Sequence, residues 1–214
     1  MQQNGNPKAT NSNFKKRKLK RRIGVEPILS SLPIDNLQTE LINAIFSHKT
    51  TIVIGETGSG KSTRLPVFIH RYLRDRGGGT VVCTQPRRVA AVTIAQRVAA
   101  ETGSDVGDVV GYTVRFDDQS SAATRIKYVT DGVLLREAIG DNTLSRYSVV
   151  VLDEAHERSI STDILIGILR TLQDQRTNFR VVVMSATLDS QLYSTFFLDS
   201  NTVFIPGRQF PVQV

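Results

Sequence analysis

Short apolar runs alternate with amphipathic stretches along most of the chain. Runs of strand length occur at 51–55, 80–84, 125–130, 148–152, 179–184 and 202–205. Apolar residues at helical spacing predict a helix from Asp35 and another that follows the glycine-rich stretch 55–63 and runs to about Arg74. Further helices are predicted at about 87–101, 131–140, 162–172 and 189–198. Strands that alternate with helices predict an α/β fold with a mostly parallel sheet flanked by helices.

Four local patterns refine this prediction. The run 148–152 is apolar on both faces, which indicates a central parallel strand. The stretch 110–116 alternates, so we expect a half-buried strand with Phe116 on the apolar face and Arg115 on the polar face. The segment 117–124 is polar and predicts a turn. In the helix at 162–172, the residues expected on one apolar side are Ile164, Leu165, Ile168, Leu169 and Leu172.

Composition places the chain among globular domains and divides its charge unevenly. The 214 residues are 40% hydrophobic, and their longest apolar runs are far too short to span a membrane. Eight of the 27 basic residues lie in residues 1–22, which leaves 19 basic against 20 acidic residues in the remainder. We therefore expect a disordered basic tail at 1–22 and a domain at 23–214. The tail suits a nuclear localisation signal, a phosphate-binding arm or a plain solvated segment.

The single cysteine and the N-terminus limit the cellular setting. Cys83 excludes an internal disulfide, and its apolar neighbours predict a buried strand thiol. The N-terminus has no apolar segment of the secretory type.

A phosphate-binding loop follows the first predicted strand. Its residues are Gly55, Glu56, Thr57, Gly58, Ser59, Gly60, Lys61, Ser62 and Thr63. The spacing G-x-x-x-x-G-K-S between a strand and a helix lets backbone N–H groups surround a phosphate. Lys61, expected to face solvent, would meet the β- and γ-phosphates of a nucleoside triphosphate, and the Ser62 hydroxyl would ligate Mg²⁺.

A second candidate site follows the apolar run 148–152. It reads Asp153-Glu154-Ala155-His156. Sites in parallel sheets lie at the carboxyl ends of strands, so both carboxylates should face the phosphate loop. One would hold Mg²⁺, and the other would orient and deprotonate the attacking water. The alternative, an acidic pair at a helix start, gives no reason for the histidine.

Seven motifs together resemble the first, ATP-binding lobe of the DEAH-box ATP-dependent RNA helicases. They are GETGSGKST at 55–63, TQPRRVAA at 84–91, GYTVRFDD at 111–118, TDGVLLRE at 130–137, DEAHER at 153–158, SAT at 185–187 and PGRQFPV at 206–212. The resemblance covers residues 30–214 and is nearest to a nuclear or nucleolar animal-type member. It implies a RecA-like P-loop NTPase fold.

The resemblance also assigns roles to individual residues. Magnesium would be held by Ser62, Asp153 and Glu154, and Glu154 would activate water. His156 and the stretch Ser185-Ala186-Thr187 would couple hydrolysis to movement between two lobes. Arg97 would stack on the adenine, with a solvated helix arginine as the alternative.

The same resemblance points to a nucleic-acid side. The residues are Arg87, Arg88, Arg115, Thr130 and Asp131. Arginines and helix starts contact phosphates, and such contacts hold a single strand of RNA without reading its sequence. The alternative is that Arg87 and Arg88 only open a solvated helix.

The resemblance implies a division of labour between two lobes. Helicases of this kind carry a second lobe with arginine fingers, and we expect it to be absent from residues 1–214. The prediction is an ATP-dependent RNA helicase whose isolated first lobe is weakly active. The alternative is a non-catalytic nucleotide- or RNA-binding fragment or short isoform. Expected partners are RNA and a protein activator or ribonucleoprotein complex, without a membrane, in the nucleus, the nucleolus or the cytoplasm.

Overall fold

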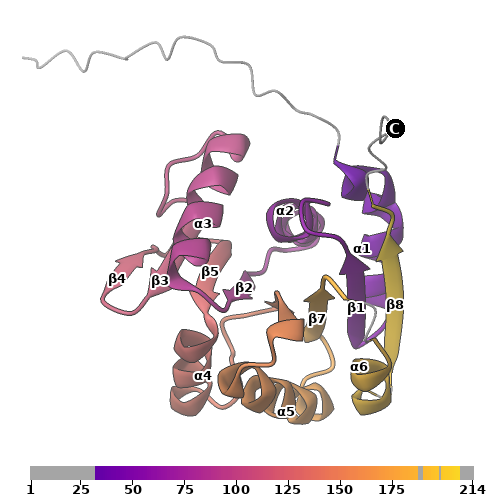
Figure 1. The fold of residues 1–214 in the computed structure, drawn as a ribbon. Helices are drawn as coiled ribbons and strands as arrows, with labels where there is room; N and C mark the ends of the chain where they lie inside the picture. Colours follow the sequence, from indigo (N-terminus) through magenta and orange to yellow (C-terminus); the bar gives the residue numbers. More distant parts are fainter. Residues whose placement is uncertain (1–31, 188–189, 198, 208–214) are drawn as a thin grey trace, which may run out of the picture.

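The computed structural model describes residues 32–187, 190–197 and 199–207, and within them a sheet separates two layers of helices (Figure 1). The strands are β1 (Thr50–Gly55), β2 (Val81–Gln85), β3 (Val110–Val114), β4 (Asp117–Gln119), β5 (Ile126–Thr130), β6 (Val149–Leu152), β7 (Arg180–Ser185) and β8 (Ser200–Ile205). Their order is β4-β3-β5-β2-β6-β7-β1-β8. Neighbouring strands pair in parallel except β3 and β4, which confirms the predicted fold class.

Helices cover both faces of the sheet, as its two-sided apolar strands require. They are η1 (Pro33–Leu37), α1 (Gln38–Ser47), α2 (Lys61–Arg74), α3 (Arg88–Thr102), α4 (Asp131–Gly140), η2 (Ala155–Glu157), α5 (Ile160–Gln175) and α6 (Ser190–Phe196), where η denotes a 3₁₀ helix. Figure 1 shows α1, α2 and α3 on one face and α4, α5 and α6 on the other.

Strand β6 lies between β2 and β7 and confirms the prediction of a central parallel strand. Val149 and Val151 join the hydrophobic core under α1, α2 and α3. Val150 and Leu152 join the core under α4 and α5 on the other face. Both sets of side chains are fully buried, because successive residues of a strand point to opposite faces.

The edge of the sheet differs from the prediction at Phe116. Strand β3 ends at Val114, and Phe116 has a φ of 67° and is 90% exposed rather than part of the buried face. Arg115 and Phe116 instead form a two-residue turn between β3 and β4. Strand β4 itself occupies residues 117–119, which were predicted to belong to a polar turn. A side-chain hydrogen bond joins β3 to the polar strand β4, because the Tyr112 hydroxyl donates to Asp117 Oδ2 at 2.9 Å.

Two helices start differently from their predicted positions. Asp35 lies within η1 and accepts the Leu32 N–H at 2.8 Å, so α1 begins only at Gln38. Helix α5 starts at Ile160, earlier than predicted, because the Ser159 hydroxyl oxygen accepts the Thr162 N–H at 3.0 Å.

The buried side of α5 is also shifted from the predicted one. Ile164, placed by its spacing on the apolar side, is 46% exposed, whereas Ile166 is buried. The side of α5 that packs on the sheet is therefore rotated slightly from the side that the spacing of apolar residues predicted.

Cys83 is buried in β2, as its apolar neighbours predicted, and burial raises the pKa of its thiol well above the usual value.

Within the described ranges, no helix has both the length and the apolar character needed to cross a bilayer. The predicted tail at 1–22 and most of the motif at 206–212 lie outside the described residues.

Candidate functional site

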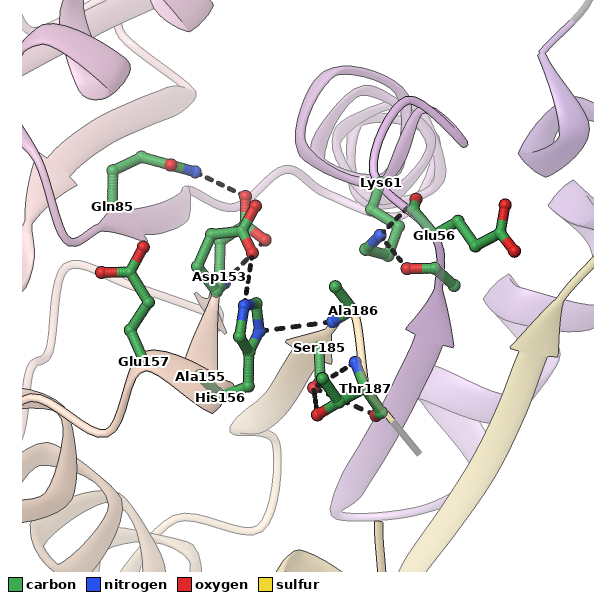
Figure 2. Close-up of polar contacts among 12 residues, drawn as sticks. Glu56, Lys61, Gln85, Asp153, Ala155, His156, Glu157, Ser185, Ala186 and Thr187 are labelled. Carbon is green, nitrogen blue, oxygen red and sulfur yellow. Dashed lines mark hydrogen bonds and ion pairs between the residues drawn. The ribbon is translucent and has the colours of Figure 1, made fainter. Parts of the chain in front are cut away.

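The carboxyl ends of β1, β2, β6 and β7 meet at one edge of the sheet, where the predicted site residues gather (Figure 2). The phosphate loop leaves β1, and Asp153 directly follows β6. Gln85 ends β2, and Ser185 ends β7. Strands far apart in the sequence thus deliver their polar side chains to a single place, as expected for the open edge of a parallel sheet.

The phosphate loop has the backbone that its glycines predicted. Gly58 and Gly60 have φ values of 84° and 98°, in the left-handed region that strains other residues. Gly60 also lacks room for a side chain, because an added Cβ would lie 2.7 Å from Ile34 Cγ2. Helix α2 begins directly afterwards at Lys61, so the loop presents the N-terminus of a 14-residue helix to a bound anion.

Lys61 is 5% exposed, and the expectation that it faces solvent was wrong. Its Nζ turns back into the loop and donates to the carbonyl oxygens of Gly55 and Glu56, the latter at 2.9 Å. Burial lowers the pKa of Lys61, while Asp153, Glu154 and Glu56 act to raise it. The ammonium group is thus poised among neutral acceptors that a phosphate oxygen can replace.

Asp153 is 1% exposed and is held from three sides. It accepts from Gln85 Nε2 at 2.5 Å and from the Glu154 N–H at 2.9 Å, and the Ser62 side chain bonds it as well. Burial raises the pKa of Asp153 to about 6, a shift opposed by the Ser62 and Gln85 hydrogen bonds.

Gln85 was missed by sequence reasoning. Its signal lies in the strand order, because Thr84 pairs with Leu152 and so places the next residue of each strand, Gln85 and Asp153, side by side. Gln85 lies within the motif TQPRRVAA at 84–91, but only the adjacency of β2 and β6 shows that its side chain meets Asp153.

The donor set fits magnesium. Ser62 and Asp153 bring a hydroxyl and a carboxylate oxygen together, and Mg²⁺ is usually held by one or two such protein oxygens together with substrate phosphates. A cation here would also relieve the cost of keeping the Asp153 carboxylate buried. Glu154, the third predicted ligand, directs its carboxylate instead toward His156.

His156 connects the acidic pair to the end of β7. Its Nδ1 accepts the Ala186 N–H at 3.3 Å, so the proton of the neutral ring lies on Nε2. That nitrogen lies 3.5 Å from Glu154 Oε2. Beside it, the Ser185 hydroxyl oxygen accepts the Thr187 N–H at 3.2 Å. His156 therefore contacts both the second carboxylate and the stretch 185–187.

Lys61, Ser62 and Glu154 of this cluster line a cavity of about 210 Å³. Its lining residues are Leu32, Thr57, Gly58, Gly60, Lys61, Ser62, Thr63, Ile94, Arg97 and Glu154. Arg97 reaches the cavity from α3, as the adenine-stacking prediction requires. Leu32 and Ile94 were not predicted, and no sequence signal marks them out.

A family model described as "DEAD/DEAH box helicase" matches residues 35–195, which is 161 of the 214 residues. The chain belongs to the DEAD/DEAH box helicase family. The matched range contains the phosphate loop, the acidic pair and the stretch 185–187. Helicase domains of this family generally bind ATP with Mg²⁺, and their work implies contact with nucleic acid.

The arginines predicted to contact nucleic acid lie on the surface of this helicase domain. The side chain of Arg87 is 77% exposed, and its Nη2 lies 3.5 Å from Glu157 Oε1. Arg88 is the exposed first residue of α3. Arg115 lies on the β3–β4 turn, with its guanidinium carbon 4.8 Å from the centre of the Phe116 ring.

The start of α4, also predicted to contact nucleic acid, places its acidic residue inside the protein. Asp131 is buried, and its Oδ2 accepts from Thr162 Oγ1 at 2.8 Å and from Ser159 Oγ at 3.3 Å. This carboxylate ties α4 to α5. Thr130 precedes the helix in extended conformation, so the backbone N–H groups at the α4 start are what remains for a phosphate.

Proposed function

We propose that this helicase domain is the ATP-binding lobe of a DEAH-type RNA helicase, which couples ATP hydrolysis to RNA unwinding or remodelling. One observation carries the proposal: Lys61, Ser62 and Glu154 line one cavity, Asp153 bonds Ser62, and His156 contacts both Glu154 and the end of β7. The histidine is the fourth residue of the D-E-A-H sequence, and its contacts give that sequence a structural reason.

The reaction is in-line attack of water on the γ-phosphorus. Glu154 accepts the proton of the water as the new P–O bond forms, and the bond to the β-phosphate oxygen breaks to leave ADP and inorganic phosphate. Lys61 exchanges its loop carbonyls for β- and γ-phosphate oxygens. Ser62 and Asp153 would hold Mg²⁺, which supplies charge neutralisation at the phosphates when bound.

His156 is the coupling residue of this proposal. Loss of the γ-phosphate changes what Glu154 contacts, and the Nε2–Glu154 interaction passes that change to the Ala186 N–H through the same ring. The stretch 185–187 follows β7 directly, so a shift there alters the surface available to a second lobe.

RNA is the proposed nucleic acid, held as a single strand without sequence preference. Arg87, Arg88, Arg115 and the α4 start offer cations and N–H groups suited to phosphates. Outside residues 1–22 the chain has 19 basic and 20 acidic residues, so binding would rely on local contacts rather than on a general positive field.

We also propose a nuclear or nucleolar location, with RNA and a protein activator or ribonucleoprotein complex as partners. The basic run within residues 15–22 supports it. Removal of residues 1–22 should move a tagged protein out of the nucleus or lower the salt dependence of RNA binding. If neither changes, the segment has no such part in the function.

Steady-state phosphate release, with and without single-stranded RNA, tests the proposed function, with Glu154→Gln as the blank. Residues 1–214 alone should turn over slowly and respond little to RNA, because an arginine finger from a second lobe contributes about 10³-fold or more. A second lobe added in trans should restore much of that factor. Fast RNA-stimulated turnover by this chain alone would contradict the division between lobes. Binding without turnover under all conditions would favour the non-catalytic binding fragment.

A further inference from the structure

Three ion pairs run in series from η1 to Arg97, which lines the cavity. Asp35 Oδ1 in η1 lies 3.7 Å from Arg64 Nε in α2. Arg64 Nη1 lies 3.2 Å from Glu101 Oε2 in α3. The other oxygen of that carboxylate, Oε1, accepts from Arg97 Nε at 2.9 Å. The series therefore crosses three elements and ends on a residue that lines the cavity.

The inner members of the series are enclosed, and its last member is open. The Arg64 and Glu101 side chains are mostly buried, whereas the Arg97 side chain is 62% exposed. Glu101 bonds the guanidinium of Arg97 through Nε, in the plane of the group. A bond in that plane fixes the orientation of the group and leaves its faces available for stacking.

The neighbours of Arg97 in the cavity indicate which part of a nucleotide it meets. The phosphate loop and Glu154 account for the phosphate side of the lining. The remaining lining residues are Leu32, Ile94 and Arg97, two aliphatic side chains and one planar cation. This combination suits the flat face of a nucleobase. These three side chains offer no amide or carboxylate that could hydrogen-bond to the edge of a base. The site should therefore accept any flat purine or pyrimidine ring.

Stability alone does not account for the series. An exposed pair four residues apart on a helix adds little to folding. The same spacing joins Arg170 to Asp174 on α5, where the pair borders no part of this cavity. Asp174 also lies 4.0 Å from Lys49, but its side chain is 63% exposed. Glu101 is only 21% exposed, and it connects through Arg64 to the turn that carries Leu32 beside the cavity.

We infer that Glu101, held by Arg64 and Asp35, is a positioning residue that orients Arg97 for the nucleobase, with Leu32 and Ile94 completing a base site that reads shape. The inference rests on the proposed ATP binding. It makes η1 part of the nucleotide site, because Leu32 packs on Gly60 of the phosphate loop while Asp35 begins the ion-pair series.

Isothermal titration calorimetry with two ligands tests this inference. The ligands are a non-hydrolysable ATP analogue and inorganic tripolyphosphate, each with Mg²⁺. Glu101→Gln should raise the Kd of the ATP analogue about threefold to tenfold, the range of a lost cation–π contact. The Kd of tripolyphosphate should stay within about twofold, because the phosphate loop is untouched. Asp174→Asn, the matched control, should change neither value.

Two further variants keep the result decisive. Glu101→Gln in an Arg97→Ala background should have no additional effect, since the residue that it orients is gone. Arg97→Lys retains the charge and removes the planar group, so it should weaken the ATP analogue and spare tripolyphosphate. Thermal unfolding of each variant should match that of the wild-type chain within a few degrees, which excludes general loss of structure.

The outcomes separate this inference from the function on which it rests. Equal weakening of both ligands by Glu101→Gln, full additivity with Arg97→Ala, or no change at all would overturn the positioning by Glu101. Wild-type protein that binds neither ligand would overturn the proposed nucleotide function itself.

Discussion

The nucleotide side and the proposed RNA side of this helicase domain are built in opposite ways. Lys61 and Asp153 are almost fully buried, and each is bonded to groups from other turns or strands before any ligand arrives. Arg87, Arg88 and Arg115 are exposed, with at most one weak contact each in the described part of the chain.

This difference follows from what each side has to bind. Burying a charge costs free energy unless the charge is paired. The charged groups of a site that excludes water therefore need hydrogen-bond or ion-pair partners within the protein itself. A protein that binds a nucleic-acid strand without sequence preference contacts mainly its phosphates. Exposed arginines are sufficient for such contacts. Substitutions on the nucleotide side should therefore have large and coupled effects, and those on the RNA side should be small and additive.

The largest expected effect belongs to Glu154. Glu154→Gln keeps the size of the side chain and removes its basicity, so ATP turnover, measured with a second lobe present, should fall about 10²- to 10⁴-fold. Glu157→Gln is the matched control, because Glu157 lies one turn away and contacts Arg87 rather than the cavity. Comparable losses in both variants would show that Glu154 is not the base.

Lys61→Ala should weaken the ATP analogue about 10- to 100-fold, the range for loss of charged hydrogen bonds. The loop carbonyls of Gly55 and Glu56 also lose their donor, so we expect a modest decrease in the melting temperature. Lys49→Ala is the control at the opposite end of β1, where Lys49 bonds Gln173 O at 3.2 Å. Unchanged affinity in Lys61→Ala would remove the phosphate assignment of this loop.

Asp153→Asn should make the ligand-free protein more stable at neutral pH while abolishing its magnesium site. The pKa of Asp153 is about 6 when folded, against 3.8 for the ordinary group. A raised carboxyl pKa means that stability is highest below pH 3.8, falls as pH rises to about 6, and then stays low. The variant cannot ionise, so its advantage should reach about 2–3 kcal/mol at pH 7 and vanish near pH 4.

Urea unfolding between pH 4 and pH 7, without metal or nucleotide, measures this advantage. Asp141→Asn is a control of opposite sign, because hydrogen bonds from Thr143 and Ser145 lower the pKa of Asp141. That substitution should cost nearly the same stability at pH 4 as at pH 7, because the stabilising contribution of a lowered carboxyl pKa is lost only below the ordinary value of 3.8. An Asp153→Asn variant less stable than the wild type at pH 7 would contradict the burial argument.

The smallest expected effect lies on the RNA side. Arg115→Ala should weaken single-stranded RNA of any sequence by a similar, few-fold factor and reduce the slope of log K against log salt by about 0.7. Arg170→Ala, which breaks a pair on the α5 surface, should leave the slope unchanged. A loss confined to one RNA sequence would show base reading instead of phosphate contact.

Most of the fold could be predicted from the sequence, because local signals mark its helices and strands. Gly103, at φ 71°, ends α3 where the pattern predicted, and the glycines of the phosphate loop adopt the conformations for which their spacing is known. The apolar run of β6 needs both faces covered, and only a central strand provides that.

The remaining features depend on contacts that spacing cannot express. Gln85 matters because β2 adjoins β6, and Lys61 turns inward because the loop carbonyls are the acceptors within reach. Phe116 adopts a positive φ to close the β3–β4 turn although it carries no turn signal in its side chain. Each of these outcomes is set by tertiary packing, which overrides local preference.

The burial of Cys83 has a practical consequence for spectroscopy. The chain contains one cysteine, and its thiol lies inside β2 with a raised pKa, so at neutral pH it is neither accessible nor present as thiolate. A cysteine introduced at a surface position such as Ile139, which is 77% exposed, would be the sole reactive handle for a maleimide dye. Single-molecule distance measurements between this domain and a labelled nucleic acid or partner lobe therefore need no removal of the native thiol.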